Sequence, residues 1–334
     1  MATIKDIANK LGISPSTVSK GLNGAHDISD EMRQLVLDTA IELGYASKKI
    51  KSRKNLNLCV LINEMDYLSP DEFGYDIILG FKQAAASSPW NIDVIKVDNN
   101  LMHSESYDTF IIKNKYHGAF LLGFNMHNPW INQLKNTIIP TVTIDTHIPF
   151  NNKVGTIESD SFEGISQAIN HLVSLGHRNI AFLNGDKNSQ ISKTRTEAFE
   201  ASLRANNIPV NEDFIKYGYY VLDSAREYVH IFMDQNATAI MCASDLIASN
   251  VINELNRMGL FVPNDVSVIG FDDIPIASKL TPKLTTIRQD RKNIGKSAYI
   301  LLDSLINDVS ISRMTLRAEF IKRESTGKAR QQLA

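Results

Sequence analysis

Hydrophobic spacing divides the chain into two parts near residue 57. In the first part, apolar side chains recur every three or four positions, which is the spacing of an amphipathic helix. The first such run is Ile4, Ile7, Ala8 and Leu11. In the second part, short apolar runs alternate with helical stretches. The pattern therefore predicts a small all-helical unit followed by a larger α/β body.

Capping residues mark three helices in the first part. Thr3 with Asp6 is typical of a capping box at a helix start. Ser14 before Pro15 predicts an N-cap followed by proline at the first helical position, and Ser29 can cap the third helix. The first two helices, separated by a four-residue turn, predict a helix-turn-helix.

The body contains short strands that are apolar on both faces. We expect them at 58–62, 92–97, 118–123, 141–145, 179–183, 238–243 and 266–271. Strands of this kind, alternating with amphipathic helices, predict parallel sheets covered by helices on both sides. Such sheets bind ligands outside the carboxyl ends of their strands.

Extended stretches of the sequence resemble the LacI (lactose repressor) family of bacterial transcription regulators. TIKDIANKLGISPSTVSKGLN followed by ISDEMRQLVLDTAIELGY resembles the family's DNA-binding headpiece. IPTVTID, HLVSLGHRNIAFLNG, VPNDVSVIGFDD, LTPKLTTIRQD and RESTGK resemble landmarks of its effector-binding body, which is similar to periplasmic sugar-binding proteins. The resemblance covers essentially the whole chain.

The resemblance implies a domain plan of α/β class. A helix-turn-helix headpiece would occupy 1–46, a basic linker 47–57, and an effector-binding and dimerisation domain 58–334. That domain would have two doubly wound parallel-sheet lobes, joined by crossovers near 156–160, 283–288 and 316–320. Lobe 1 would comprise about 58–157 and 285–317, and lobe 2 about 158–284 and 318–330.

The second helix exposes short polar side chains and one lysine. Small hydroxyls near a helix start can approach phosphates, and lysine can reach the acceptors of guanine; alone, these residues would also suit a solvated face. The resemblance implies that Pro15, Ser16 and Lys20 face bases, whereas Thr17 and Ser19 hold phosphates. The family more often has arginine in place of Lys20, and a lysine lacks the bidentate fork, so softer discrimination of guanine is expected.

The linker is strongly basic. Residues 45–58 contain no acidic residue and five basic ones: Lys48, Lys49, Lys51, Arg53 and Lys54. Such a segment can be a solvated linker, or it can fold against DNA as the family's hinge helix does. The apolar wedge of the family pattern is missing here unless Leu56 supplies it from a shifted register, so we expect electrostatic docking with less DNA kinking than is usual.

The resemblance also implies an effector site. Arg195 would reach the ligand, Asp145 and Asp272 would accept hydrogen bonds from its hydroxyls, and Ser244 stands where many relatives have asparagine. The two aspartates could instead cap helices or turns. An aromatic wall would come from Phe73, Tyr75 and Tyr220.

Net charge taken over the whole chain disfavours a role in DNA binding, since the total is −2. Residues 1–58, however, contain nine Lys and Arg against six Asp and Glu, whereas the remainder has 26 against 31. A basic head on an acidic body leaves DNA contact to the headpiece and linker.

No metal site, cofactor motif or catalytic constellation is readable from the spacing of reactive residues. Cys59 and Cys242 lie in apolar runs and are expected to be buried thiols. Residues 1–12 lack a secretory h-region, so a cytoplasmic location is expected.

The predicted function is therefore a homodimeric or larger regulator that binds a pseudo-palindromic operator under control of a sugar-like or nucleobase effector. The alternatives are a stand-alone sugar-binding protein serving a transporter and, less favoured, an enzyme on a doubly wound fold.

Overall fold

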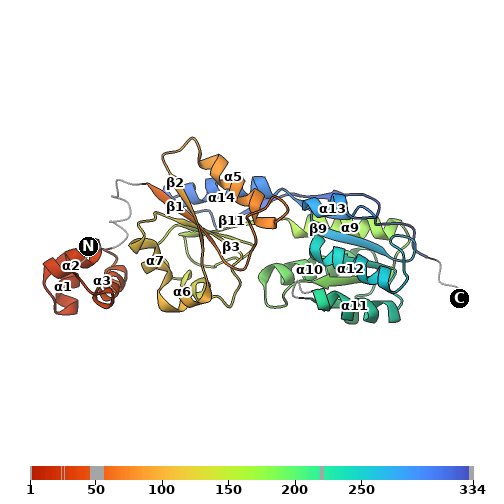
Figure 1. Cartoon of the computed structure of the whole chain (residues 1–334), viewed down its shortest axis with the longest axis horizontal. Helices are drawn as coiled ribbons and strands as arrows, with labels where there is room; N and C mark the ends of the chain where they lie inside the picture. Colours follow the sequence, from red (N-terminus) through yellow and green to blue (C-terminus); the bar gives the residue numbers. More distant parts are fainter. Residues whose placement is uncertain (1, 24, 26, 46–55, 219–221, 331–334) are drawn as a thin grey trace. The chain divides into compact units, whose positions relative to one another are not determined.

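The computed structural model describes residues 2–23, 25, 27–45, 56–218 and 222–330 (Figure 1). The chain folds into two compact units. Unit 1 comprises Met1–Met65, Ile78–Ile157 and Gly295–Met314, and unit 2 comprises Asp66–Ile77, Glu158–Ile294 and Thr315–Ala334.

The headpiece, residues 2–45 of unit 1, contains α1 (Ile4–Leu11), α2 (Pro15–Asn23) and α3 (Asp30–Glu42). Three predicted caps are confirmed. Thr3 forms a capping box with Asp6, Ser14 Oγ accepts from Thr17 N at 3.1 Å, and Ser29 Oγ accepts from Met32 N at 3.2 Å. Its small core consists of Ile7, Ala8, Val18, Val36 and Ala40.

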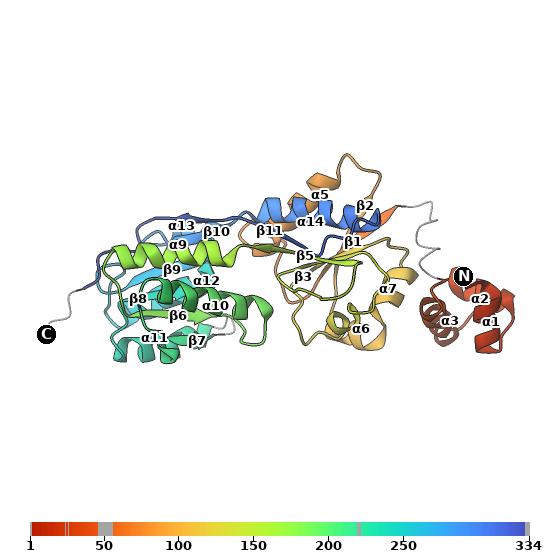
Figure 2. The same ribbon diagram turned by 180° about the vertical axis from the view of Figure 1, so that it is seen from behind.

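The rest of unit 1 is a sheet in the order β11-β5-β4-β3-β1-β2, in which β1 to β5 run parallel. The strands are β1 (Asn57–Ile62), β2 (Asn91–Lys96), β3 (Ala119–Leu122), β4 (Thr141–Ile144), β5 (Val154–Ser159) and β11 (Arg313–Leu316). The helices are α5 (Phe73–Ala85), α6 (Asn99–Ser104), α7 (Tyr107–Lys113), α8 (Pro129–Gln133) and α14 (Arg291–Ile306). The first residues of α5, up to Ile77, and of α14, up to Ile294, group with unit 2. Helices α5 and α14 lie on one face of this sheet, where the rings of Phe81 and Tyr299 pack edge to face. Helices α6 and α7 lie on the other face (Figures 1 and 2).

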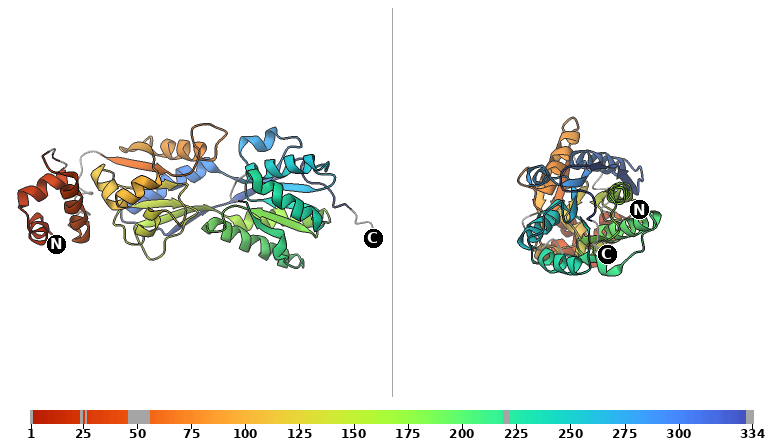
Figure 3. Two further views of the ribbon diagram at one scale, coloured as in Figure 1. Left: turned by 60° about the horizontal axis from the view of Figure 1, so that its bottom comes forward. Right: turned by 90° about the vertical axis from the view of Figure 1, so that its right-hand side faces the viewer.

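Unit 2 repeats this architecture with a sheet in the order β12-β10-β9-β8-β6-β7. The strands are β6 (Ile180–Asn184), β7 (Ile215–Tyr217), β8 (Ala239–Cys242), β9 (Ser267–Asp272), β10 (Thr285–Gln289) and β12 (Ala318–Ile321). The helices are α9 (Ser161–Ser174), α10 (Gln190–Ala205), α11 (Leu222–Asp234), α12 (Asp245–Arg257) and α13 (Pro275–Lys279), with a 3₁₀ turn at Glu212–Phe214. One helix layer contains α9 and α10, the opposite layer α11 and α12, with the sheet between them (Figure 3). Only β12 is antiparallel to its neighbour among the pairings described.

All seven predicted strands are present, and the predicted fold class is confirmed. The observed units differ from the expected lobes at residues 66–77, 285–294 and 315–317, which the resemblance assigns to the first lobe. β10 pairs in parallel with β9, Thr285 opposite Ile269, so it belongs to the sheet of unit 2. The chain changes units only after Ile294. An apolar run predicts a strand but does not indicate which sheet that strand joins.

Buried polar and sulfur groups of the body have structural roles. His177 is buried, with Nδ1 2.9 Å from Thr238 Oγ1 and Nε2 3.0 Å from the carbonyl of Gly327. Burial lowers the pKa of His177, which favours the neutral ring. Cys59 and Cys242 are free and buried, as predicted, and burial raises the pKa of both thiols. No helix among the described residues is long and apolar enough to cross a bilayer.

Candidate DNA-binding face and effector site

Helix α2 presents the predicted DNA-contacting residues near its start. Pro15, Ser16 and Lys20 are exposed, whereas Thr17 and Ser19 are half-buried. The hydroxyls of Ser14 and Thr17 lie 2.8 Å apart. The exposed trio can therefore reach a partner without rearrangement of the helix.

Lys20 forms an ion pair that the sequence did not predict. Its Nζ contacts Oδ2 of Asp27, in the turn between α2 and α3, and the two side chains are 47 % and 61 % exposed. Exposed pairs contribute about 0–1 kcal/mol. The ammonium of Lys20 thus remains available to DNA.

The linker residues proposed to bind DNA lie outside the described residues. They are Lys48, Lys49, Lys51, Arg53 and Lys54. Tyr220, expected in the aromatic wall, also lies outside the described residues.

Arg195 forms the centre of the candidate effector site in unit 2. It projects from α10 and is only 4 % exposed, with Nη1 donating to the carbonyl of Ala243 at 2.7 Å. Its guanidinium carbon lies 3.8 Å from the ring centroid of Phe271. No acceptor among the described residues lies within hydrogen-bond distance of Arg195 Nε. A buried, fixed donor without an acceptor is costly unless a ligand supplies one.

Asp272 ends β9 beside this arginine. Its Oδ1 accepts from Gln289 Nε2 at 2.7 Å. Burial raises the pKa of Asp272 to about 6, although Arg195, Gln289 and Arg291 each favour the ionised form. Its φ of +106° is strained for a non-glycine residue, and such strain is concentrated at functional sites. The next helix, α13, has Ile274 as its N-cap, so Asp272 is not a helix cap.

The residues after β8 are engaged in local structure. Ser244 is buried and its Oγ accepts from Ile247 N at 3.1 Å, which makes it the N-cap of α12. Asp245 is fully buried and accepts from Thr286 Oγ1 at 2.5 Å and Ile274 N at 2.8 Å. These contacts give Asp245 a supporting role in the loop after β9. Ser244 lies next to the carbonyl that holds Arg195, but its own oxygen serves the helix.

Residues 66–77 also group with unit 2. Phe73 and Tyr75 are half-buried in the first turn of α5. Arg291 connects this segment to the Asp272 region, because its Nη2 lies 3.0 Å from Asp76 Oδ2 and its Nη1 donates to the carbonyl of Glu72 at 3.2 Å.

Sequence reasoning missed Gln289, Arg291 and Asp76. One available signal was position, because Gln289 ends the buried strand β10 as Asp272 ends β9, and Arg291 follows two residues later. Asp76 gave no such signal, since it lies within a helix.

Asp145 is found in unit 1, at the carboxyl end of β4. Its φ is +53°, and its backbone N–H donates to the carbonyl of Ile157 at 3.0 Å. The element that follows is β5 and not a helix, so the helix-cap alternative does not apply to Asp145 either.

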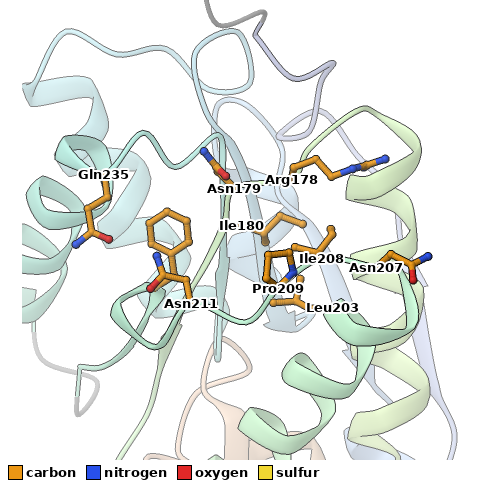
Figure 4. A pocket seen from close by; sticks show the side chains of 10 residues that line it. Arg178, Asn179, Ile180, Leu203, Asn207, Ile208, Pro209, Asn211 and Gln235 are labelled. Atoms are coloured by element: carbon orange, nitrogen blue, oxygen red, sulfur yellow. The ribbon is translucent and has the colours of Figure 1, made fainter.

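A pocket of about 450 Å³ opens on another edge of unit 2 (Figure 4). It lies at the amino end of β6, around Asn179 and Ile180, whereas Arg195 and Asp272 lie by the carboxyl ends of β8 and β9. Asn207, Asn211 and Gln235 add amide groups to its rim. It is therefore separate from the candidate effector site. No group of three or more potential metal ligands occurs among the described residues.

Two family models match the chain over separate regions. Residues 3–48 match the model described as "Bacterial regulatory proteins, lacI family", and residues 169–326 match a "Periplasmic binding protein-like domain". The chain belongs to the LacI family. The resemblance read from the sequence is confirmed, and this LacI-family member is a DNA-binding transcriptional regulator.

Relatives align along nearly the full length of this LacI-family chain. It is 28 % identical to "HTH-type transcriptional repressor PurR" of Pasteurella multocida, over 97 % of this chain and 98 % of the relative. The solved structure of a "transcriptional regulator CelR-cellobiose complex" covers 97 % of this chain and 100 % of its own, with 23 % identity and a TM-score of 0.71. The solved structure of a lac repressor dimer bound to operator and the anti-inducer ONPF covers 98 % of this chain and 99 % of its own, with 22 % identity and a TM-score of 0.68.

Proposed function

We propose that this LacI-family regulator is a repressor that binds a pseudo-palindromic operator as a homodimer, and that a small polyhydroxylated effector controls its operator affinity. The observation that carries the effector proposal is the buried guanidinium of Arg195, which is fixed on Phe271 and has no acceptor for Nε among the described residues. We assign this cluster a binding role and propose no catalytic step.

The chemistry of the cluster suits sugar hydroxyls, which donate and accept hydrogen bonds together. Arg195 supplies donors, and Asp272 supplies an acceptor whose orientation is held by Gln289. Asp145, Phe73, Tyr75, Ser244 and Tyr220 remain proposed contacts. The cellobiose complex of CelR supports a sugar or sugar derivative, and a nucleobase is the other class to be tested.

Control of DNA binding requires unequal effector affinity for two arrangements of the protein. We propose domain boundaries at 1–46, 47–57 and 58–334, with the effector changing the spacing of two headpieces in the dimer. The headpiece contacts proposed are those of α2 and of the basic linker. We propose that the protein acts in the bacterial cytoplasm, where transcription is regulated.

A thermal-shift screen of the full chain tests the effector proposal. A ligand that binds the native state raises the melting temperature, and a hundredfold excess over Kd stabilises by about 2.7 kcal/mol. The screen should compare neutral sugars, sugar acids, sugar phosphates and nucleobases. Stabilisation by a sugar class supports the proposal, stabilisation by nucleobases alone replaces it, and no shift with any class contradicts a small-molecule effector of these kinds.

Lys20→Ala should weaken binding to the preferred DNA site, obtained by selection from a random duplex library. Loss of a lysine contact to guanine costs about 1–3 kcal/mol on that site, with a smaller loss on random DNA. Fluorescence anisotropy on both duplexes measures the difference. Lys10→Ala is the matched control, because Lys10 is an exposed headpiece lysine paired with Glu42 at 2.5 Å. Equal losses on both duplexes would reduce Lys20 to a phosphate contact.

Effector affinity should fall at acidic pH. Asp272 has a pKa of about 6, and its protonation replaces an acceptor with a hydroxyl donor. For a neutral sugar that requires the ionised form, binding should be about tenfold weaker at pH 5 than at pH 8. Calorimetric titrations of the wild type and Asp272→Asn measure this; the variant should bind weakly at both pH values. A wild-type affinity that does not change over this range would exclude Asp272 as an ionised acceptor.

A further inference from the structure

Arg291 is a buried cation shared between two parts of unit 2. Its side chain is 8 % exposed and pairs with Asp76 at 3.0 Å, while it also donates to the carbonyl of Glu72. The same guanidinium favours ionisation of Asp272. Charges this well buried are weakly screened by solvent, so a change at either carboxylate is felt by the arginine.

One hydrogen bond and two residues of chain connect Asp272 to Arg291. Gln289 is buried at the end of β10 and donates to Asp272 Oδ1, and Arg291 follows two residues later. The neighbouring Asp273 is fixed by Arg288 at 2.8 Å and by Arg323 at 2.6 Å. These contacts hold the end of β9 against β10, where Asp272 lies opposite Arg288.

The segment contacted by Arg291 consists of a loop, residues 66–72, followed by the first residues of α5, and the loop has its own hydrogen bonds. Glu72 Oε2 accepts from Leu68 N at 2.5 Å and from Ser69 N at 2.9 Å. Glu72 N donates to the carbonyl of Ser69, and Gly74 N to that of Asp66. These hydrogen bonds connect the loop to the first turn of α5.

We propose that Arg291 is a positioning residue that couples the effector-binding carboxylate Asp272 to the segment 66–77. The coupling rests on the proposed function and identifies how the state of that site is transmitted. When an effector hydroxyl donates to the ionised carboxylate of Asp272, or a proton neutralises that carboxylate, Asp272 attracts Arg291 less strongly. Arg291 then interacts more strongly with Asp76, and the segment is held more firmly. By reciprocity, a firmly held segment favours either state in which Asp272 attracts Arg291 less.

The position of the segment along the chain explains how this coupling can act on unit 1. Residues before 66 and after 77 belong to unit 1, whereas the segment itself groups with unit 2. It also carries Phe73 and Tyr75, two proposed effector contacts. A change at Asp272 thus reaches a stretch that is covalently continuous with unit 1 on both sides.

A second ion pair to the same segment provides a matched control. Lys279 pairs with Asp71 at 2.9 Å, but the two side chains are 64 % and 62 % exposed, and such a pair contributes little. Lys279→Gln therefore removes one cation that pairs with the segment and keeps Arg291 in place.

Hydrogen exchange of the full chain, followed by mass spectrometry without any effector, tests the hold on the segment. Arg291→Gln should accelerate exchange of the amides of Leu68, Ser69, Glu72 and Gly74 by about tenfold through easier local opening. Lys279→Gln should change it by less than about twofold. Equal effects of the two substitutions would overturn the proposal. If Arg291→Gln fails to fold, Asp76→Asn is used in its place, because it removes the same ion pair at the half-exposed carboxylate.

The decisive measurement is a double-mutant cycle with Asp272→Asn. This substitution does not touch the segment, yet it should slow exchange there by about threefold, and the effect should vanish in the Arg291→Gln or Asp76→Asn background. The coupling would be overturned if Asp272→Asn left the exchange rate of the segment's amides unchanged. It would also be overturned if Asp272→Asn slowed exchange equally in a background that lacks the ion pair. Because no effector is used, a failed effector screen leaves this result standing, and an uncoupled cycle rejects Arg291 without rejecting the effector site.

Discussion

Arg195→Ala should abolish the response of the regulator to its effector while operator binding without effector stays unchanged. A hydrogen bond to a charged group contributes about 1.5–3 kcal/mol, so each one lost should weaken effector binding by roughly tenfold to 150-fold. The substitution also leaves Asp272 without one of the cations that favour its ionised form. Calorimetry with the effector found by screening, together with anisotropy on the selected DNA site, measures the two properties separately.

The matched control for Arg195 lies on the same helix. Arg204, near the end of α10, is exposed and pairs with Glu200 at 2.7 Å, so Arg204→Ala removes the same charge from α10 without approaching Phe271. Arg195→Lys adds a second comparison, because lysine keeps the charge but loses the planar fork. An effector response that persists in Arg195→Ala, or is lost equally in Arg204→Ala, would remove Arg195 from the site.

Local sequence signals predicted the headpiece in detail because its structure depends on neighbouring residues. A cap acts over three positions, so Thr3, Ser14 and Ser29 could be read directly, and each accepts the expected backbone hydrogen bond. The same holds for the buried strands, whose apolar runs are continuous. The exposed face of α2 followed from these, because the buried residue Val18 fixes which side of the helix faces solvent.

Long-range pairing explains what the sequence did not predict. The membership of β10 in the sheet of unit 2 depends on its pairing with β9, and the ion pair between Arg291 and Asp76 joins residues 215 positions apart in sequence. Ser244 shows a different limit, since a serine before an aspartate can contact a ligand or cap a helix. The choice is visible only once α12 begins at Asp245 and Ser244 Oγ accepts from Ile247 N. The candidate site is therefore predictable strand by strand, whereas the contacts that fix its charges are not.

Gly270→Ala should destabilise unit 2 strongly, although it adds only one methyl group. Gly270 lies in β9, between β8 and β10. An added Cβ would overlap Asp245 Oδ1 and lie 2.7 Å from Leu284 Cδ2. Asp245 cannot give way easily, because it is fully buried and holds Thr286 and the N–H of Ile274. Breaking a buried polar network of this kind costs about 3–5 kcal/mol.

The two tryptophans make this loss measurable unit by unit. Trp90 and Trp130 both belong to unit 1, so their fluorescence follows unit 1, whereas far-UV circular dichroism follows both units. In urea, Gly270→Ala should shift the circular dichroism transition to lower urea concentration than the fluorescence transition. Gly259→Ala is the control, because Gly259 has φ +75° and no atom within 4 Å of an added Cβ, so it should cost only about 1 kcal/mol of backbone strain. Equal losses of stability for the two substitutions would show that the contact with Asp245 does not constrain β9. The supporting role assigned to Asp245 would then be wrong.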